Sequence, residues 1–400
     1  MAESMNKIRA SRAGAGGFLA IAATFVVTMM GTTLPTPLYP IYQAQLGFSQ
    51  LMITVIFAAY AVGVIGALIV TASWSDQIGR RPLLALGLAF SAASAVAFLM
   101  DDSLTPLLIG RVLSGISAGI FTGTATVAVV ELAPPRWASM ATFVATAANM
   151  GGLGLGPLVA GITAQYLPAP LLLCFGLDLV LIVLVGCAVW IVPETAQRPE
   201  RPRLRVRWPA VPPDVLPTFV PAAIAGFAGF AVLGLFTAIA PAFMGDILHR
   251  HNHALTGLVV FLVFMASLLG QLGQGRLPEA ARLPFGCAAL VVGMIGVGLA
   301  VIEASLVWLV LGGVIAGMGQ GIAFRAGMGA VTQASPPARR AEVASTFFVV
   351  VYIAISIPVV GLGVTARLAG LPTAGVVFAA GVALLALVSL LTLLRRRHTD

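Results

Sequence analysis

The stretch GFLAIAATFVVTMMGTTLPTPLY, residues 17–39, decides the fold class because it contains no charged residue. It is long enough to cross a bilayer as a helix, which takes about 20 apolar residues. The charge-free run continues from residue 13 to residue 75, which allows two crossings and a turn. Hydrophobic residue types make up 59% of the chain and charged types 9%, whereas soluble domains carry about 25% charged residues. A soluble or disordered protein is excluded, and a polytopic membrane protein is indicated.

Similar charge-poor runs follow along the whole chain and predict twelve spans. The runs do not alternate with a period of two residues, as the strands of a membrane barrel do. Helices satisfy their own backbone hydrogen bonds in lipid, so we expect an all-α integral membrane protein. The expected spans are residues 17–39, 49–72, 82–100, 105–131, 139–164, 170–192, 217–244, 255–274, 284–302, 305–331, 342–365 and 372–394.

The distribution of basic residues predicts the orientation. Of the 22 lysines and arginines, all but Arg111, Arg250, Arg325 and Arg367 fall at the termini or in one set of alternate loops. Basic residues concentrate in cytoplasmic loops. We therefore expect a multi-pass protein of a bacterial-type inner (plasma) membrane, with both termini cytoplasmic. The net charge of +8 follows from this topology and from contact with anionic membrane lipid, and it needs no nucleic-acid partner.

The segment 193–216 cannot be a span, because it contains many prolines and arginines. It predicts a cytoplasmic linker between an N-terminal six-helix bundle, residues 1–192, and a C-terminal six-helix bundle, residues 217–400.

The two bundles repeat each other in sequence. A shift of 202 residues lays Arg80 on Arg282 and Glu131 on Gln333. The same shift aligns glycines and prolines in order: Gly110 with Gly312, Gly115 with Gly317, Gly119 with Gly321, Pro134 with Pro336, and Pro135 with Pro337. Such parallel repeats are typical of transporters that bind substrate near the midplane between the halves. Because one chain holds both halves, we expect it to work as a monomer.

The loop after the second span, WSDQIGRRP at residues 74–82, combines a carboxylate, a turn residue and two cations. Asp76, Gly79, Arg80 and Arg81 have the groups that a breakable clamp between neighbouring helices needs. A plain positive-inside loop is the alternative, and it explains the arginines but not their spacing from the acid.

This loop resembles the loop 2–3 signature of the major facilitator superfamily, G-x-x-x-D-x-x-G-R-R, with Ala72 in place of the leading glycine. In the second half the counterpart keeps Arg282 but has Pro278 instead of the acid. The resemblance covers all twelve spans, the duplication and the linker, and it is nearest to the drug:proton antiporter branch. It implies two pseudosymmetric bundles that rock about a central cavity, with the loop acting as a conformational latch.

Arg111 lies within the fourth span and begins a row of residues at four-residue steps, Gly115, Gly119 and Gly123. Small residues let helices approach closely, and an arginine in a span needs a partner or a wet cavity. The row resembles the family's R-x-x-x-G motif, which implies a role for Arg111 in proton coupling. The alternative is an arginine that reaches the outer interface.

The fifth span contains GLGLGPLVAG at residues 152–161, which resembles the family's antiporter signature G-x-x-x-G-P-x-x-G-G. Gly152, Gly156, Pro157 and Gly161 match it, and Ala160 replaces a glycine. The resemblance implies a seam between the halves that is found in exporters. Simple helix packing is the alternative.

Asp178 is the one acid well inside a span. Its depth in the sixth span matches that of Arg111 in the fourth within about 2 Å, at 1.5 Å per residue. We consider it a proton-coupling candidate that could pair with Arg111. A structural ion pair is an equal alternative, since the family's drug antiporters often carry their acid on the first span, which has none here.

Polar and aromatic residues on the spans suggest an apolar, aromatic cavity for lipophilic or mildly polar small molecules. Arg325 lies on the tenth span, which lines the cavity in the resembled family, although it could also reach the inner interface. The substrate-binding candidates are Thr28, Thr32, Tyr60, Asn149, Phe236, Thr237, Gln320, Phe324, Arg325 and Tyr352. Each of them alone is also compatible with helix packing.

Nothing in the sequence indicates catalysis or a cofactor. His249, His251 and His253 have a spacing that could bind a metal ion, but we interpret them as part of a solvated loop and expect no metal site. The sequence contains no phosphate-binding G-x-x-x-x-G-K-[ST] loop for ATP, so an ion or substrate gradient would supply the energy. We expect proton-coupled efflux of small molecules by alternating access. The alternatives are a proton symporter or exporter of a metabolite such as a sugar or amino acid, and a membrane sensor that has lost transport.

Overall fold

The computed structural model describes residues 2–71, 74–100, 103–196, 199–200, 204, 206 and 208–397. These residues form helices and connecting turns and contain no strand, and twelve of the helical segments are long and apolar enough to cross a membrane. The all-α prediction and the number of spans are confirmed. Ala72 of the loop signature and the linker arginines 198, 201, 203, 205 and 207 lie outside the described residues.

The first bundle holds six crossing segments. They are α1 (Ala2–Thr33) with its continuation η1 (Thr36–Leu38) and α2 (Tyr39–Leu46), then α3 (Gln50–Thr71), α5 (Arg80–Leu99), α6 (Leu104–Leu132), α7 (Ala141–Tyr166) and α8 (Pro170–Ile191). The short α4 (Trp74–Ile78) and η2 (Pro135–Met140) lie in the connections.

The second bundle repeats this order. It consists of α9 (Leu216–Ala238), the short α10 (Ala240–Ala242) and η3 (Phe243–Ile247), α11 (His253–Gly273) with η4 (Gln274–Arg276), α12 (Glu279–Ile302), α13 (Leu306–Ala334), η5 (Pro337–Arg339), α14 (Arg340–Ala369) and α15 (Leu371–Arg397).

Two predicted ends were wrong, and prolines explain both. The first crossing does not end at residue 39 but continues to Leu46 through a 3-10 turn. Pro35 and Pro37 have no backbone N–H to donate, so the helix is interrupted and then resumes. The seventh does not reach residue 244, because α9 ends at Ala238 and a π-helical turn follows Pro241.

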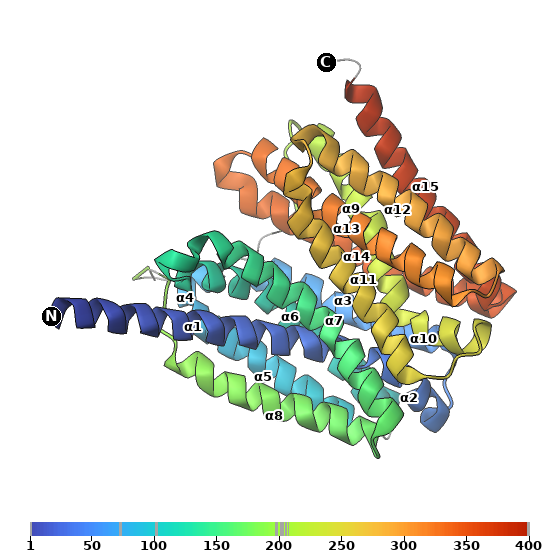
Figure 1. Ribbon diagram of the computed structural model, residues 1–400, viewed down its shortest axis with the longest axis horizontal. Helices are drawn as coiled ribbons and strands as arrows, with labels where there is room; N and C mark the ends of the chain where they lie inside the picture. The colour runs from blue at the N-terminus through green and yellow to red at the C-terminus, as the bar shows by residue number, and fades with distance from the viewer. Residues whose placement is uncertain are drawn as a thin grey trace.

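The two bundles diverge from a region of close contact (Figure 1). They meet near α2 and α10, which we call the far side, and separate toward the ends where the N- and C-termini lie, which we call the terminal side. On the far side α7 packs against α11, and α3 packs against α14. The backbone N–H of His253 donates to Oε1 of Gln165 at 2.9 Å, and its ring nitrogen Nδ1 lies 3.2 Å from the Pro37 carbonyl. The bundles are therefore closed on the far side.

The glycine row after Arg111 brings α6 against α3. A Cβ atom on Gly115 would collide with the carbonyl oxygen of Tyr60, and one on Gly119 would lie 2.8 Å from the Ala67 side chain. Gly123 has nothing within 4 Å of the corresponding position. Only the first two glycines therefore serve packing, and their contact places Arg111 beside Tyr60.

Candidate functional site

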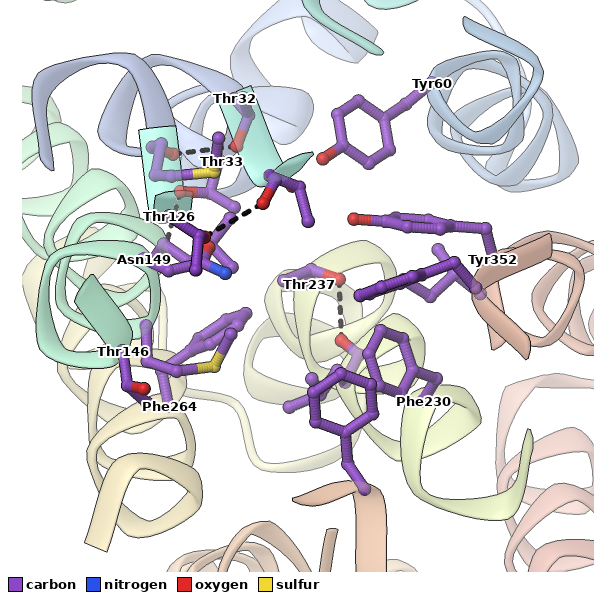
Figure 2. A pocket seen from close by; sticks show the side chains of 18 of the residues that line it. Thr32, Thr33, Tyr60, Thr126, Thr146, Asn149, Phe230, Thr237, Phe264 and Tyr352 are labelled. Carbon is purple, nitrogen blue, oxygen red and sulfur yellow. Dashed lines mark hydrogen bonds between the residues drawn. The ribbon is translucent and has the colours of Figure 1, made fainter. Parts of the chain in front are cut away.

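A cavity of about 310 Å³ lies between the two bundles. Its walls come from α1, α3, α6 and α7 of the first bundle and α9, α11, α13 and α14 of the second (Figure 2). Six of the substrate-binding candidates line it: Thr32, Tyr60, Asn149, Thr237, Phe324 and Tyr352. Both bundles contribute lining residues, so relative motion of the bundles would change the shape of the cavity.

Arg111 is the only charged side chain among the described residues that line this cavity. It is 2% exposed, and its Nη1 donates to the carbonyl oxygen of Thr32 on α1 at 2.7 Å. Its guanidinium carbon lies 4.7 Å from the ring centre of Tyr60 and 5.3 Å from that of Phe57. Each contact of this kind contributes about 0.5–2 kcal/mol. The arginine is thus held by α1 and α3 and does not reach an outer interface.

The second bundle supplies a wall of aromatic rings. The rings of Phe230 and Phe324 have centroids 5.2 Å apart, and those of Phe324 and Phe348 are 5.9 Å apart. Tyr352 faces Tyr60 of the first bundle across a centroid distance of 6.4 Å, and both hydroxyl groups point into the cavity (Figure 2). The site can therefore stack flat apolar molecules and offer them two phenol groups.

Sequence reasoning missed a row of threonines on the first bundle. Thr122 and Thr126 line the cavity from α6, and Thr146 lines it from α7. Each hydroxyl donates to the carbonyl oxygen four residues earlier in its own helix, at 2.8 or 2.9 Å. The remaining lone pairs leave each oxygen available as an acceptor. Thr122 and Thr126 lie on the same face of α6 as Arg111, and this spacing could have identified them from the sequence.

Four candidates do not line this cavity. Thr28 is buried and donates to the Thr24 carbonyl at 2.9 Å, and Phe236 packs against Gly313. Gln320 is buried between α13 and α11, where its Oε1 accepts a hydrogen bond from the Ser267 hydroxyl group at 2.5 Å. Arg325 lines a separate cavity on the terminal side. Their helices were assigned correctly to the cavity, but the sequence did not reveal which face of each helix turns inward.

Asp178 lies outside the cavity. Its side chain is buried at 3% exposure and packs against Gly31, where a Cβ would lie 2.7 Å from its Oδ2. Its Oδ1 has no hydrogen-bond partner among the described residues. Arg111 and Asp178, both described, form no ion pair in this structure, so the considered pairing is absent from this conformation. They instead contact neighbouring residues of α1, Thr32 and Gly31.

The loop signature forms a cluster of ion pairs inside the first bundle. Arg80 is 8% exposed and lies 2.6 Å from Asp76 and 3.1 Å from Glu131. The backbone N–H groups of Arg80 and Arg81 donate to the Glu194 carboxylate at 2.8 and 3.2 Å. Gly79 has φ of 107°, a conformation that favours glycine. Glu131 and Glu194, which were not predicted, therefore tie the ends of α6 and α8 to this loop.

The glycines of the fifth span serve two interfaces. Gly152 and Gly156 pack against α1, where added Cβ atoms would collide with the Val26 and Met30 carbonyl groups. Gly161 packs against the backbone of His253 on α11. The carbonyl group of Pro157 lies against Gly257 of the same helix. Of the four residues that match the motif, only Pro157 and Gly161 lie against the second bundle, and they do so on the far side. The intervening Gly154 also packs against Phe264 of α11.

Residues 21–359 match the family model described as "Major Facilitator Superfamily". The chain is 24% identical over 136 residues to the quinolone resistance protein NorA of Staphylococcus aureus, covering 34% of this chain and 35% of NorA. It is 24% identical over 139 residues to multidrug resistance protein 1 of Bacillus subtilis, covering 35% and 36%. The matched segment thus spans about a third of these curated relatives.

A crystal structure of a bacterial homologue of the human lysosomal transporter Spinster, described as inward-facing and unoccupied, has a similar fold. The TM-score is 0.71 at 15% identity, over 96% of this chain and 98% of that one. Three observations point to one family: the twelve helices, the two bundles around a central cavity, and the family match over most of the sequence. The chain belongs to the major facilitator superfamily.

Proposed function

We propose that this transporter exports small lipophilic or mildly polar molecules in exchange for protons. The observation that carries the proposal is the central cavity. Its walls are aromatic and hydroxyl-bearing, and Arg111 is the one charged side chain among its described lining residues. Few charges and many flat rings suit lipophilic ligands. The drug-resistance names of two relatives agree with this substrate class.

We assign the terminal side to the cytoplasm. The arrangement of basic residues at the termini and in alternate loops supports this orientation. With this assignment, the conformation is closed to the outside by the contacts between α7 and α11 and between α3 and α14. The cavity then takes up substrate from the cytoplasm or the inner leaflet, which is the direction that an exporter needs.

In the proposed cycle the bundles rock until the far side opens and the terminal side closes. The contact of Gly161 and Pro157 with α11 closes the outer side in the present state. Asp76, Arg80 and Arg81 contact residues of their own bundle here. In the outward-open state we propose that this loop exchanges part of its ion pairs for contacts with the second bundle and so acts as a latch.

Proton coupling would use Arg111 and Asp178. Both contact adjacent residues of α1, so a change at one of them can move the backbone that the other contacts. An isolated charge is costly in such surroundings. A proton that binds to or leaves the buried carboxylate can therefore bias the position of α1.

The experiment that tests the function uses energised inside-out vesicles that contain the protein. A fluorescent probe follows the internal pH while a fluoroquinolone, a lipophilic cationic dye, a sugar or an amino acid is added. Proton efflux on addition of the drug or the dye supports antiport of lipophilic compounds. A response to the sugar or amino acid alone would assign a metabolite instead. No response in vesicles that contain folded protein would overturn the proposal.

Replacing Asp178 by Asn should abolish substrate-driven proton movement while substrate counterflow, which requires no net proton exchange, continues. Asn has almost the same shape but cannot carry the proton. The exposed Asp246 in η3 provides the control, because Asp246→Asn removes a carboxylate that does not line the central cavity. Proton movement that persists in Asp178→Asn vesicles would assign Asp178 a structural role only.

A further inference from the structure

A second cavity, of about 490 Å³, lies in the second bundle on the terminal side. It is formed where α11 ends, α12 begins and α13 approaches its end. Two arginines line it, Arg282 from α12 and Arg325 from α13, together with Gln274, Glu279 and Gln333. The transport cycle proposed above assigns no role to these residues.

The internal repeat shows that two acids of the first bundle have no acidic counterpart at this cavity. In the first bundle Arg80 is neutralised by Asp76 at 2.6 Å and by Glu131 at 3.1 Å. The shift of 202 residues places Arg282 at the position of Arg80, and Gln333 at that of Glu131. The position of Asp76 is taken by Pro278. Arg282 and Gln333 do line one cavity, so the second bundle has kept the cation and has neither acid.

The two arginines have no carboxylate partner among the described residues. Nε of Arg282 donates to the carbonyl oxygen of Leu277 at 3.1 Å, which leaves its terminal N–H groups free to bind a ligand. Arg325 has no hydrogen bond or ion pair within the described part of the chain. Glu279 is exposed and, although it lines the same cavity, forms no ion pair with either arginine. The cavity therefore carries a net positive charge.

Gln274 provides an independent indication of a ligand. It lines this cavity at 8% exposure, and its Oε1 has no hydrogen-bond partner among the described residues. A buried amide without a partner costs about 1–3 kcal/mol. By rotating half a turn, it can present either its oxygen to a hydroxyl group or its NH₂ group to an anion.

We propose that this cavity binds a phosphate-bearing anion between Arg282 and Arg325. Arginine binds phosphate oxygens through paired N–H donors, and basic pockets between helices on the cytoplasmic side can hold lipid head groups. The phosphate can come from an anionic phospholipid or from a soluble phosphate compound. Met328 lines both this cavity and the central one, so the bound anion lies beside the edge of the substrate cavity.

The test measures binding to the purified full-length protein in a non-ionic detergent, by native mass spectrometry and by the midpoint of thermal unfolding. The probes are dioctanoyl phosphatidylglycerol and inorganic phosphate, with dioctanoyl phosphatidylcholine as the zwitterionic control. Binding of the phosphatidylglycerol alone identifies a lipid site, and binding of inorganic phosphate identifies a soluble anion. Failure of both anionic probes to bind more tightly than the control would overturn the proposal, whatever the transport assay shows.

Three substitutions locate the binding. Arg325→Gln should weaken binding about 10- to 150-fold, the loss expected for charge-assisted hydrogen bonds worth roughly 1.5–3 kcal/mol. Arg276→Gln removes the same charge from the neighbouring η4 turn, outside the lining of the cavity, and should leave binding unchanged. Gln333→Glu should also weaken binding, because it is expected to give Arg282 the carboxylate that Glu131 gives Arg80.

The glutamate variant keeps the test independent of misfolding, because a new ion pair with Arg282 should not lower the unfolding midpoint measured without probe. Binding that persists at full strength in both Arg325→Gln and Gln333→Glu would show that the anion binds elsewhere on the protein.

Discussion

Replacing Arg111 by Ala is expected to lower the initial rate of substrate-driven proton movement by at least about tenfold, the equivalent of roughly 1.4 kcal/mol. The substitution removes the one charge among the described lining residues of the central cavity. It also removes the donor to the Thr32 carbonyl and the cation that lies over the rings of Tyr60 and Phe57. Without Arg111, α6 loses the side chain that contacts both α1 and α3 at the cavity.

Lysine at the same position separates charge from geometry. Arg111→Lys keeps the cation, but a lysine is a compact point charge and lacks the planar fork of arginine. We expect partial activity, because its ammonium group cannot serve the Thr32 carbonyl and both ring faces at once. The vesicle pH assay measures both variants at equal amounts of folded protein, judged by their elution profiles in size-exclusion chromatography.

Arg136 offers a matched control for the loss of an arginine over an aromatic ring. Its guanidinium carbon lies 4.7 Å from the ring centre of Trp137, but it is exposed in η2 and does not line the cavity. Arg136→Ala should leave transport unchanged. Equal rates for Arg111→Ala and the unmodified protein would contradict any role for Arg111 in coupling.

The twelve spans could be predicted because the evidence for them is strong and local. Each required only a long apolar run with few or no charges, and ten of the twelve predicted spans lie close to the observed helices. The two failures, at residues 39 and 244, occur where prolines interrupt the backbone pattern without changing the hydropathy. Hydropathy reports where a chain is apolar, and it does not report where the helix bends.

The cavity was harder to predict, because each helix shows one face to it and the apolar spans carry no periodic polar stripe. Phe236 and Thr237 are adjacent on α9, yet only Thr237 lines the cavity while Phe236 packs against Gly313. Asp178 and Arg111 were predicted at similar depth, but depth says nothing of direction. Their side chains reach α1 at neighbouring residues without meeting each other.

The glycine motif of the fifth span illustrates the same limit. The sequence predicted a seam between the halves, but Gly152 and Gly156 pack on α1 within their own bundle. Gly161 alone among the three packs against the other bundle. Spacing identified the residues that permit close approach, while the partner of each depended on how the helix is rotated in the folded protein.

This division makes Gly161 a position where an added side chain should shift the conformational equilibrium. Gly161→Leu inserts its Cβ against the backbone of His253 on α11, and backbone cannot rotate away as a side chain can. Overpacking of this kind costs about 1–3 kcal/mol. The cost applies only to the state that is closed on the far side, so the ratio of far-closed to far-open molecules should fall roughly 5- to 150-fold.

Gly151 is the matched control on the same helix. A Cβ at Gly151 meets nothing within 4 Å, so Gly151→Leu adds the same apolar volume to α7 without the backbone collision expected at Gly161. Labelling of a Thr126→Cys reporter by a membrane-impermeant maleimide follows the equilibrium, since Thr126 lines the cavity. The exposed Cys187 is replaced by Ser in all variants to remove background labelling.

In vesicles that expose the terminal side, the reporter should react more slowly in Gly161→Leu than in Gly151→Leu, because the cavity is turned away from the reagent. In vesicles of the opposite orientation the order should reverse.

Gly257→Ala places a single methyl group against the Pro157 carbonyl across the same interface. It should shift both labelling rates in the same direction as Gly161→Leu, but by less. Equal labelling of all three variants would mean that this contact does not hold the far side closed. The closure would then depend on α3 and α14, where a Cβ on Gly363 would collide with Thr54.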